Sequence, residues 1–333
     1  MTGLYYHTKL NLFIQFRIFA PVEKLKEGSA TVVKHTGSHY MVSSLPEWKL
    51  VSCVVKGKMR MKDLHTTNPI AVGDHVDYQL QEDGTGIISN IYPRKNYIIR
   101  KSTNLSRQAH IIAANIDVAF LIVTIDFPET KWAFMDRFLV TCEAYKVPVT
   151  IVLNKTDLLT EEYAEKVKYF KRIYSQAGYR ILEVSCKTGY NTSLLKEELK
   201  GKICLFSGMS GVGKSSLINS LDSSLSLKTG KISDYHMQGK HTTTFYEIHP
   251  VENGGFIIDT PGIKGFGLIE MKPDELSHYF PEMLKRLDKC KFAPCTHTHE
   301  PECAVKEAVE KGYISTDRYV SYLGMLEEES KYR

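Results

Sequence analysis

The pattern G-x-x-x-x-G-K-[ST] limits what this chain can fold into more than any other feature of its sequence. It runs from Gly208 to Ser215, after an apolar run at 203–206 and before a helical pattern at 216–221. A strand, a glycine-rich turn and a helix together make a phosphate-binding loop, because glycine amides can turn towards phosphate oxygens and a helix N-terminus favours anions. For the motif alone, a glycine turn without a ligand is the alternative.

The motif predicts a role for each position of this loop. We expect Lys214 to reach the β- and γ-phosphates and the Ser215 hydroxyl to bind Mg²⁺. The remaining positions that we expect around the phosphates are Gly208, Met209, Ser210, Gly211, Val212, Gly213 and Ser216. The motif therefore predicts a nucleoside triphosphate site.

Apolar runs and helical patterns alternate on both sides of the loop. The predicted strands have the continuous apolar character of buried parallel strands, and they cover Val118–Ile125, Val147–Leu153, Ile181–Val184, Ile203–Phe206 and Gly255–Ile258. The predicted helices cover Ala133–Tyr145, Glu161–Gln176 and Asn191–Leu199. This alternation predicts a doubly wound α/β domain over residues 106–270. Residues 271–333 show helical spacing and predict a small helical domain.

The first third of the chain has a different texture. Over residues 28–105, short alternating β-runs are separated by turn residues and show no helical pattern. About five strands in roughly 70 residues predict an OB-type barrel, a fold that often binds nucleic acid. Residues 1–108 hold 15 Lys and Arg against 8 Asp and Glu, a net charge of +7, whereas the remainder of the chain carries −2. We expect the barrel to bind RNA. The alternatives are a solvated charged surface or a structural spacer.

Two basic segments are candidates for this contact. The first is Lys56-Gly57-Lys58-Met59-Arg60-Met61-Lys62, and the second combines Tyr92 and Tyr97 with Arg94, Lys95, Arg100, Lys101 and Arg107. Cations beside aromatic rings can follow a phosphate backbone and stack on bases.

The remaining bulk features point to the cytoplasm. Residues 1–27 show no clear period, and we expect an N-terminal extension without an assigned role. Their apolar stretch from Leu10 to Ala20 is interrupted by polar residues, which does not fit a signal peptide. The chain has no run of 18 apolar residues of the kind that spans a membrane. Its seven scattered cysteines do not form a disulfide framework.

Two short motifs predict that the base is guanine. In Asn154-Lys155-Thr156-Asp157, the Asp157 carboxylate can accept hydrogen bonds from guanine N1–H and the 2-amino group, a pair of donors that adenine lacks. We expect Asn154 to hold the loop and the Lys155 stem to lie along the purine ring. In Ser185-Cys186-Lys187, a backbone N–H can meet guanine O6. Each motif alone also fits an ordinary turn.

A third motif, Asp259-Thr260-Pro261-Gly262, ends the last predicted strand. We expect Asp259 to hold Mg²⁺ and the Gly262 N–H to sense the γ-phosphate; a proline turn is the alternative. All four motifs stand at carboxyl ends of predicted strands, where ligands bind in open α/β sheets. Jointly they predict a GTP-binding domain.

The order of these motifs is unusual. In most GTPases the phosphate loop comes first, but here N-K-T-D at 154 and S-C-K at 185 precede the loop at 208, and D-T-P-G follows at 259. The cyclic order is preserved, so the sequence predicts a circular permutation, which folds tolerate when the termini lie close together. The segment after Gly262 then leads directly into residues 263–333, so the nucleotide state can be passed to the tail domain.

The group that positions the attacking water is less well specified. Ile263 follows Gly262, where a glutamine would orient water, and an isoleucine side chain forms no hydrogen bond. The segment Gly239-Lys240-His241-Thr242-Thr243-Thr244 offers His241 for this role and Thr242 and Thr243 for nucleotide binding, with Thr243 as the Mg²⁺ ligand. An exposed loop histidine is the alternative for His241.

The tail domain contains a predicted metal site. Cys290, Cys295, His297 and Cys303 fall within 14 residues and match the ligands of a closed, structural zinc site. His299 is an alternative fourth ligand, and unpaired buried cysteines are the alternative to a metal. We expect Cys53, Cys142, Cys186 and Cys204 to be ordinary core residues.

The combination of a basic barrel, permuted motifs, a G-K-H-T-T-T segment, D-T-P-G and a C-x4-C-x-H-x5-C tail resembles the bacterial GTPases that depend on the small ribosomal subunit. The resemblance covers residues 28–330. It implies a late-acting, monomeric assembly factor of the 30S subunit that binds 16S rRNA through the barrel and the zinc domain. It also implies that His241 is catalytic and that Cys290, Cys295, His297 and Cys303 hold zinc.

Two other function classes stay open at this point. One is a signalling GTPase that is not ribosomal and binds a protein through its barrel. The other is a nucleotide-binding scaffold without turnover, which Ile263 would allow.

Overall fold

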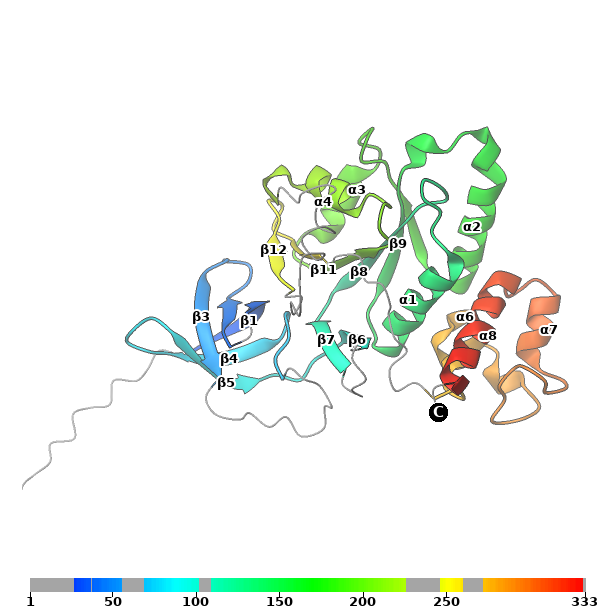
Figure 1. Cartoon of the computed structure of the whole chain (residues 1–333), viewed down its shortest axis with the longest axis horizontal. Helices are drawn as coiled ribbons and strands as arrows, with labels where there is room; N and C mark the ends of the chain where they lie inside the picture. The colour runs from blue at the N-terminus through cyan, green and yellow to red at the C-terminus, as the bar shows by residue number, and fades with distance from the viewer. Residues whose placement is uncertain are drawn as a thin grey trace, which may run out of the picture.

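The computed structural model describes residues 27–36, 38–55, 69–101, 109–225, 246–259 and 272–331. Three parts follow one another along the chain: a β-barrel, a layered α/β unit and a small helical unit, with the α/β unit in the middle (Figure 1). The fold predicted from the sequence is confirmed in all three parts. None of the helices in the described part of the chain has the length and apolar character needed to span a bilayer.

Five short strands close into the predicted barrel in the order β1-β2-β3-β5-β4. They are β1 (Glu27–His35), β2 (Tyr40–Ser43), β3 (Leu50–Val55), β4 (His75–Leu80) and β5 (Gly86–Ile91). Their alternating apolar residues fill the barrel, among them Val32, Val76 and Ile88. Gly86 of β5 pairs with Cys53 of β3, and a Cβ on Gly86 would stand 2.4 Å from the buried Cys53 Sγ, so this position favours a glycine.

A β-hairpin that the sequence did not predict joins the barrel to the α/β unit. It pairs β6 (Tyr97–Lys101) with β7 (Ala109–Ala114). In the sequence, the basic residues of this stretch indicate an RNA contact, and its two strands were not predicted. Asn96 and Asn115 fix its base, since the Asn96 side chain bonds both the N–H and the C=O of Ile116, and Asn115 Nδ2 donates to Gly73 O.

The α/β unit is built on a six-stranded sheet in the order β10-β9-β8-β11-β13-β12. Five strands are parallel: β8 (Val118–Val123), β9 (Val149–Leu153), β10 (Arg180–Glu183), β11 (Ile203–Gly208) and β13 (Phe256–Asp259). Edge strand β12 (Ile248–Pro250) is antiparallel to β13 and was not predicted. It is only three residues long and contains Pro250, which a sheet tolerates at its edge.

Helices cover both faces of this sheet. On one face lie α1 (Trp132–Ala144) and α2 (Ala164–Ala177), and on the other α3 (Thr192–Leu199) and α4 (Lys214–Leu221). Short 3-10 turns, η1 (Thr156–Leu158), η2 (Glu161–Tyr163) and η3 (Ser223–Leu225), complete the connections. Because both faces are covered, the parallel strands are apolar throughout, which explains why their positions could be predicted from continuous apolar runs.

The C-terminal unit is helical in its described residues, as predicted. It comprises η4 (Leu276–Tyr279), α6 (Pro281–Leu284), η5 (Leu287–Lys289), α7 (Ala304–Glu310) and α8 (Thr316–Lys331). It packs against α1 and α2 of the α/β unit (Figure 1). Arg318 lies at this contact with its side chain 1% exposed, between Asp136 of α1 and Glu282 of α6. This buried ionic cluster was not predicted, because its members are far apart in the sequence.

Candidate functional site

The candidate nucleotide site lies at the carboxyl edge of the sheet. Strands β9, β10, β11 and β13 end there, and each of them leads into one of the four short motifs. The parallel register brings these ends to one level, since Leu153 pairs with Glu183 and Phe206 pairs with Asp259. The fold therefore gathers on one edge the motifs that begin as far apart in the chain as residues 154 and 259.

Three glycines give the phosphate-binding loop its shape. A Cβ on Gly208 would stand 2.6 Å from the carbonyl oxygen of Ile122 on the neighbouring strand, so the loop can leave β11 only at a glycine. Gly211 and Gly213 have φ values of +86° and +89°, which residues with a side chain rarely adopt. The loop then enters α4, whose first residue is Lys214. Its N-terminal amides face the loop, which is the arrangement that binds phosphate.

The N-K-x-D motif supports this loop directly. Asn154 Nδ2 donates to the carbonyl oxygen of Val212 at 2.9 Å, and Lys155 Nζ donates to the carbonyl oxygen of Gly211 at 2.7 Å. A side chain on Gly213 would collide with Asn154, because its Cβ would stand 2.6 Å from Nδ2. These contacts tie the base-binding segment to the phosphate-binding segment, so the distance between the two is fixed before a nucleotide binds.

The other side of the site holds Asp157. Ser185 Oγ donates to Asp157 Oδ1 at 2.6 Å and itself accepts from the N–H of Thr188 at 3.2 Å. Lys187 Nζ lies 3.9 Å from the second carboxylate oxygen. The serine of S-C-K thereby orients the carboxylate that we expect to select guanine, a role for Ser185 beyond the one that its motif predicted. Cys186 lies between Ser185 and Lys187 in the chain and is half-buried.

Lys214 and Asp259 are in contact with each other at the phosphate end. They form an ion pair, and their side chains are 9% and 10% exposed. Ser215 and Ser216 follow Lys214 in the first turn of α4. This places a cation and a carboxylate side by side at the point where the sheet edge meets the helix N-terminus, which suits a polyphosphate and its Mg²⁺ ion.

Several predicted residues lie outside the described part of the chain. They are His241, Thr242, Thr243, Gly262 and Ile263, together with the basic segment from Lys56 to Lys62 and Arg107. Their roles stay predictions.

The four predicted metal ligands come together in the C-terminal unit. The ligand atoms of Cys290, Cys295, His297 and Cys303 all lie within 4.8 Å of one another. His297 Nδ1 is 3.3 Å from Cys303 Sγ and 3.7 Å from Cys290 Sγ, and the two sulfurs are 4.0 Å apart. The edges of a zinc tetrahedron with thiolate and imidazole ligands measure about 3.6–3.8 Å. The cluster thus has the size and chemistry to hold a metal ion. His299 is exposed and bonded to Thr298, so the structure favours His297.

A carboxylate supports the loop that carries two of these ligands. Glu300 accepts hydrogen bonds from the N–H and the hydroxyl of Thr296 and from the N–H of Thr298, at 2.6–3.0 Å. Burial opposes its ionisation, but these hydrogen bonds prevail and lower the pKa of Glu300 to about 2. Tyr319 and Tyr322 of α8 donate to the carbonyl oxygens of His297 and Thr296. The loop is therefore fixed from both sides.

Part of the predicted RNA-binding segment has a structural role instead. Arg94 is 6% exposed and forms a bidentate pair with the buried Asp74 at 2.6 Å, so it is not available to a phosphate. Tyr97 packs against Tyr145 with ring centroids 4.8 Å apart, which removes it as a stacking platform. Lys95 is half exposed and Tyr92 is 43% exposed. Periodicity could not reveal the pairing of Arg94, because its partner is 20 residues away.

The loop between β8 and α1 also lies at the site, and this was not predicted from the sequence. A Cβ on Gly211 would stand 3.2 Å from the Pro128 ring, and the carbonyl oxygen of Phe127 accepts a 2.5 Å hydrogen bond from Lys155 Nζ. Phe127 has a φ of 63° and its side chain is 50% exposed. An Asp-Phe-Pro turn matches no nucleotide-binding motif, so only the fold could place it beside the phosphate loop.

Comparison with known proteins agrees with this arrangement. A family model described as RsgA GTPase matches residues 91–269, and another described as RsgA N-terminal domain matches residues 29–88. The small ribosomal subunit biogenesis GTPase RsgA of Bacteroides fragilis is 52% identical over 304 residues, which cover 91% of this chain and 98% of that protein. The protein of the same name from Flavobacterium johnsoniae is 51% identical over 309 residues, which cover 92% and 95%.

Two solved structures share the fold along almost the whole chain. YjeQ from Thermotoga maritima superimposes with a TM-score of 0.74 at 37% identity and covers 91% of this chain and 98% of its own. YloQ, described as a circularly permuted GTPase, gives a TM-score of 0.70 at 26% identity and covers 94% and 98%. The description of YloQ as circularly permuted agrees with the permuted motif order of this chain. The chain belongs to the RsgA family of GTP-hydrolysing enzymes.

Proposed function

We propose that this chain binds the small ribosomal subunit and assists its late maturation, hydrolysing GTP to GDP and phosphate with stimulation by the subunit. The observation that carries the proposal is the 52% identity, over almost the full length of both chains, to proteins named for small ribosomal subunit biogenesis. The convergence of the four motifs on one sheet edge supports GTP as the substrate. Such an enzyme acts in the cytoplasm, where ribosomes assemble, and we propose that it acts as a monomer.

The proposed site residues divide by the part of the nucleotide that they meet. Asp157, held by Ser185, selects guanine, while Asn154 holds the loop and the Lys155 stem lies along the purine ring. The positions around the phosphates and Mg²⁺ are 208–216, Thr242, Thr243, Asp259 and Gly262, with Ser215, Thr243 and Asp259 as the metal ligands. Mg²⁺ would supply charge neutralisation between the β- and γ-phosphates. Cys186 and Lys187 complete the base loop, and His241 is the proposed residue that orients the attacking water.

We propose one structural zinc ion in the C-terminal unit. The donor set of three sulfurs and one imidazole nitrogen, with separations close to those of a tetrahedral site, supports zinc over harder cations. All four positions would be filled by protein, so the ion would have a structural role.

The proposed domain bounds are 1–27 for the extension, 28–105 for the barrel, 106–270 for the GTPase domain and 271–333 for the zinc domain. The barrel and the zinc domain would contact 16S rRNA. The basic first third supports this, since residues 1–108 carry a net charge of +7. Because Arg94 is buried and paired with Asp74, the RNA contact would use other, more exposed cations of this region.

The experiment that tests the proposal measures GTP hydrolysis with and without purified small subunits. We expect slow turnover alone and a large increase with the subunit, together with co-sedimentation that is stronger with a non-hydrolysable GTP analogue than with GDP. Binding through phosphate contacts would weaken steeply between low and moderate salt. Equal turnover with and without subunits would refute the proposed function.

A further inference from the structure

The barrel contacts the α/β unit through main-chain atoms as well as through side chains. An isolated antiparallel β-bridge pairs Lys34 of β1 with Glu247, the residue before edge strand β12. Their side chains also form an ion pair at 2.7 Å, with exposures of 40% and 37%. One pair of residues thus makes both a main-chain and a charged contact between two domains.

Apolar side chains pack beside the Lys34–Glu247 pair and extend the contact between the two domains. β1 has a bulge between Val32 and Lys34, and a bulge of this kind redirects side chains. Val33 is 1% exposed and belongs to the core of the α/β unit together with Ile248, whereas Val32 belongs to the core of the barrel. Trp48 of the barrel also stacks on Phe256 of β13, with ring centroids 5.9 Å apart. The barrel therefore rests on the β12–β13 hairpin.

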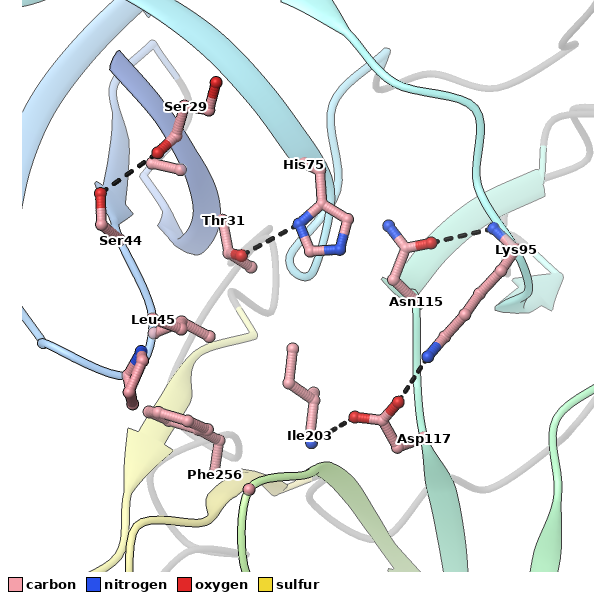
Figure 2. A pocket seen from close by; sticks show the side chains of 13 residues that line it. Ser29, Thr31, Ser44, Leu45, His75, Lys95, Asn115, Asp117, Ile203 and Phe256 are labelled. Carbon is pink, nitrogen blue, oxygen red and sulfur yellow. Dashed lines mark hydrogen bonds and ion pairs between the residues drawn. The ribbon is translucent and has the colours of Figure 1, made fainter.

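A cavity separates the hairpin contact from a second contact, the ion pair of Lys95 with Asp117. It has a volume of about 500 Å³, and Figure 2 shows Thr31 and His75 of the barrel facing it from one side and Asp117 and Phe256 from the other. On its far side, Lys95 pairs with Asp117 at 2.5 Å. The contact with the hairpin and the Lys95–Asp117 pair therefore lie on opposite sides of this cavity.

The register of the hairpin connects this contact to the nucleotide site. Ile248 pairs with Ile258, and these two residues are the chain neighbours of Glu247 and Asp259. Opposed residues of an antiparallel pair have Cα atoms only about 4.5–5.5 Å apart. Asp259 is the carboxylate in contact with Lys214 of the phosphate loop. Contacts therefore lead from Lys34 and Glu247, through the paired residues Ile248 and Ile258 of the hairpin, to Asp259 and Lys214 at the phosphate end of the site.

We propose that Lys34 and Glu247 are positioning residues for GTP hydrolysis, through which the barrel holds the hairpin so that Asp259 lies correctly at the phosphate end. The two side chains are paired with each other and belong to none of the predicted nucleotide-binding motifs, so we expect the pair to set turnover more than nucleotide affinity. This inference rests on the proposed role of Asp259 in the site. It also gives the barrel, the proposed RNA-binding domain, a direct mechanical connection to the chemistry.

The test reverses the charges. Lys34→Glu and Glu247→Lys are made singly and together in the full-length protein. Each single variant should lower intrinsic kcat about threefold, the factor expected when a partly exposed ion pair is lost, while the GDP dissociation constant stays unchanged. The double variant restores the pair with opposite polarity and should recover most of the lost kcat. Hydrogen exchange in residues 246–259 should rise in the single variants and return towards normal in the double variant.

A matched control is Lys168→Glu, which removes an exposed ion pair with Glu165 on α2, away from the barrel, and should leave kcat unchanged. Single variants with normal kcat, or a double variant no better than the singles, would overturn the positioning role. A fall in GDP affinity equal to the fall in kcat would also overturn it, since that pattern indicates general damage. The proposed ribosomal function fails separately: it fails if small subunits do not stimulate the wild-type protein, whatever the charge reversal does to intrinsic turnover.

Discussion

The buried Arg318 offers the sharpest prediction about stability. Its guanidinium donates to Glu282 through Nε at 2.7 Å and Nη2 at 3.0 Å, and to Asp136 through Nη1 at 2.7 Å. It also lies 4.9 Å from the centroid of the Phe280 ring. Arg318→Met keeps most of the volume but removes the charge, which leaves two carboxylates buried without a cation.

Removing one partner of a buried ion pair costs about 3–5 kcal/mol. The C-terminal unit is small, and small domains have free energies of unfolding near the lower end of the usual 5–15 kcal/mol. We therefore expect Arg318→Met to lose most of the stability of this unit, with a shift in the urea midpoint of at least about 1 M. Arg172→Met is the control, because Arg172 is exposed over the ring of Tyr169 and a surface change costs under about 0.5 kcal/mol.

The fluorescence of Trp132 can report on the contact between the C-terminal unit and the α/β unit. Trp132 stacks on Tyr174 at 5.7 Å, and Tyr174 lies under the guanidinium of Arg318 at 5.6 Å. The only other tryptophan is Trp48 in the barrel, so a Trp48→Phe background makes the signal specific. A urea midpoint of Arg318→Met equal to that of its Trp48→Phe parent would refute the argument that the ion cluster holds the C-terminal unit in place.

The pH dependence of Arg318→Met follows from the carboxylates left behind. Burial already raises the pKa of Asp136 against the opposing effect of Arg318, and loss of the guanidinium raises it further. A carboxyl group whose folded pKa lies above its unfolded pKa favours the folded state when protonated. The deficit of Arg318→Met relative to its parent should therefore shrink as the pH is lowered from 8 to 5 and grow as it is raised.

Four further predictions concern the two sites. Asp157→Asn should weaken GTP binding about 10- to 100-fold, since a hydrogen bond to a charged group is worth about 1.5–3 kcal/mol, and leave ATP binding as weak as before; an unchanged GTP-to-ATP affinity ratio would contradict its role. His241→Ala should lower turnover about 100-fold or more with normal GDP affinity, both measured on the same preparation. Cys303→Ser should reduce the zinc content from one ion per chain to none, by elemental analysis, and lower the melting temperature as a chelator does. Glu300→Gln should cost about 1 kcal/mol at pH 7 after allowance for solvent screening. The folded pKa of about 2 is below the unfolded value, so this difference is present above about pH 4, is lost as the pH falls towards 2, and is read from melting temperatures across that range.

The sequence determined the local chemistry of this protein. A phosphate-binding loop needs particular glycines at fixed spacing, so Gly208, Gly211 and Gly213 identify it without a structure. Buried parallel strands need continuous apolar runs, which located β8, β9, β10, β11 and β13 within a few residues. Metal ligands that lie close in the chain, from Cys290 to Cys303, were likewise visible as a pattern.

Only the tertiary structure decided the contacts between residues far apart in the chain. Arg94 is a cation in a basic segment that favours RNA binding, yet the fold buries it against Asp74. The pairing of Arg318 with Asp136 spans 182 residues, and the barrel reaches the phosphate end of the site through a hairpin whose strand β12 is only three residues long. Local sequence sets what a segment can form, because backbone geometry and burial act over a few residues. Which charged groups neutralise one another depends on distances that exist only after the chain has folded.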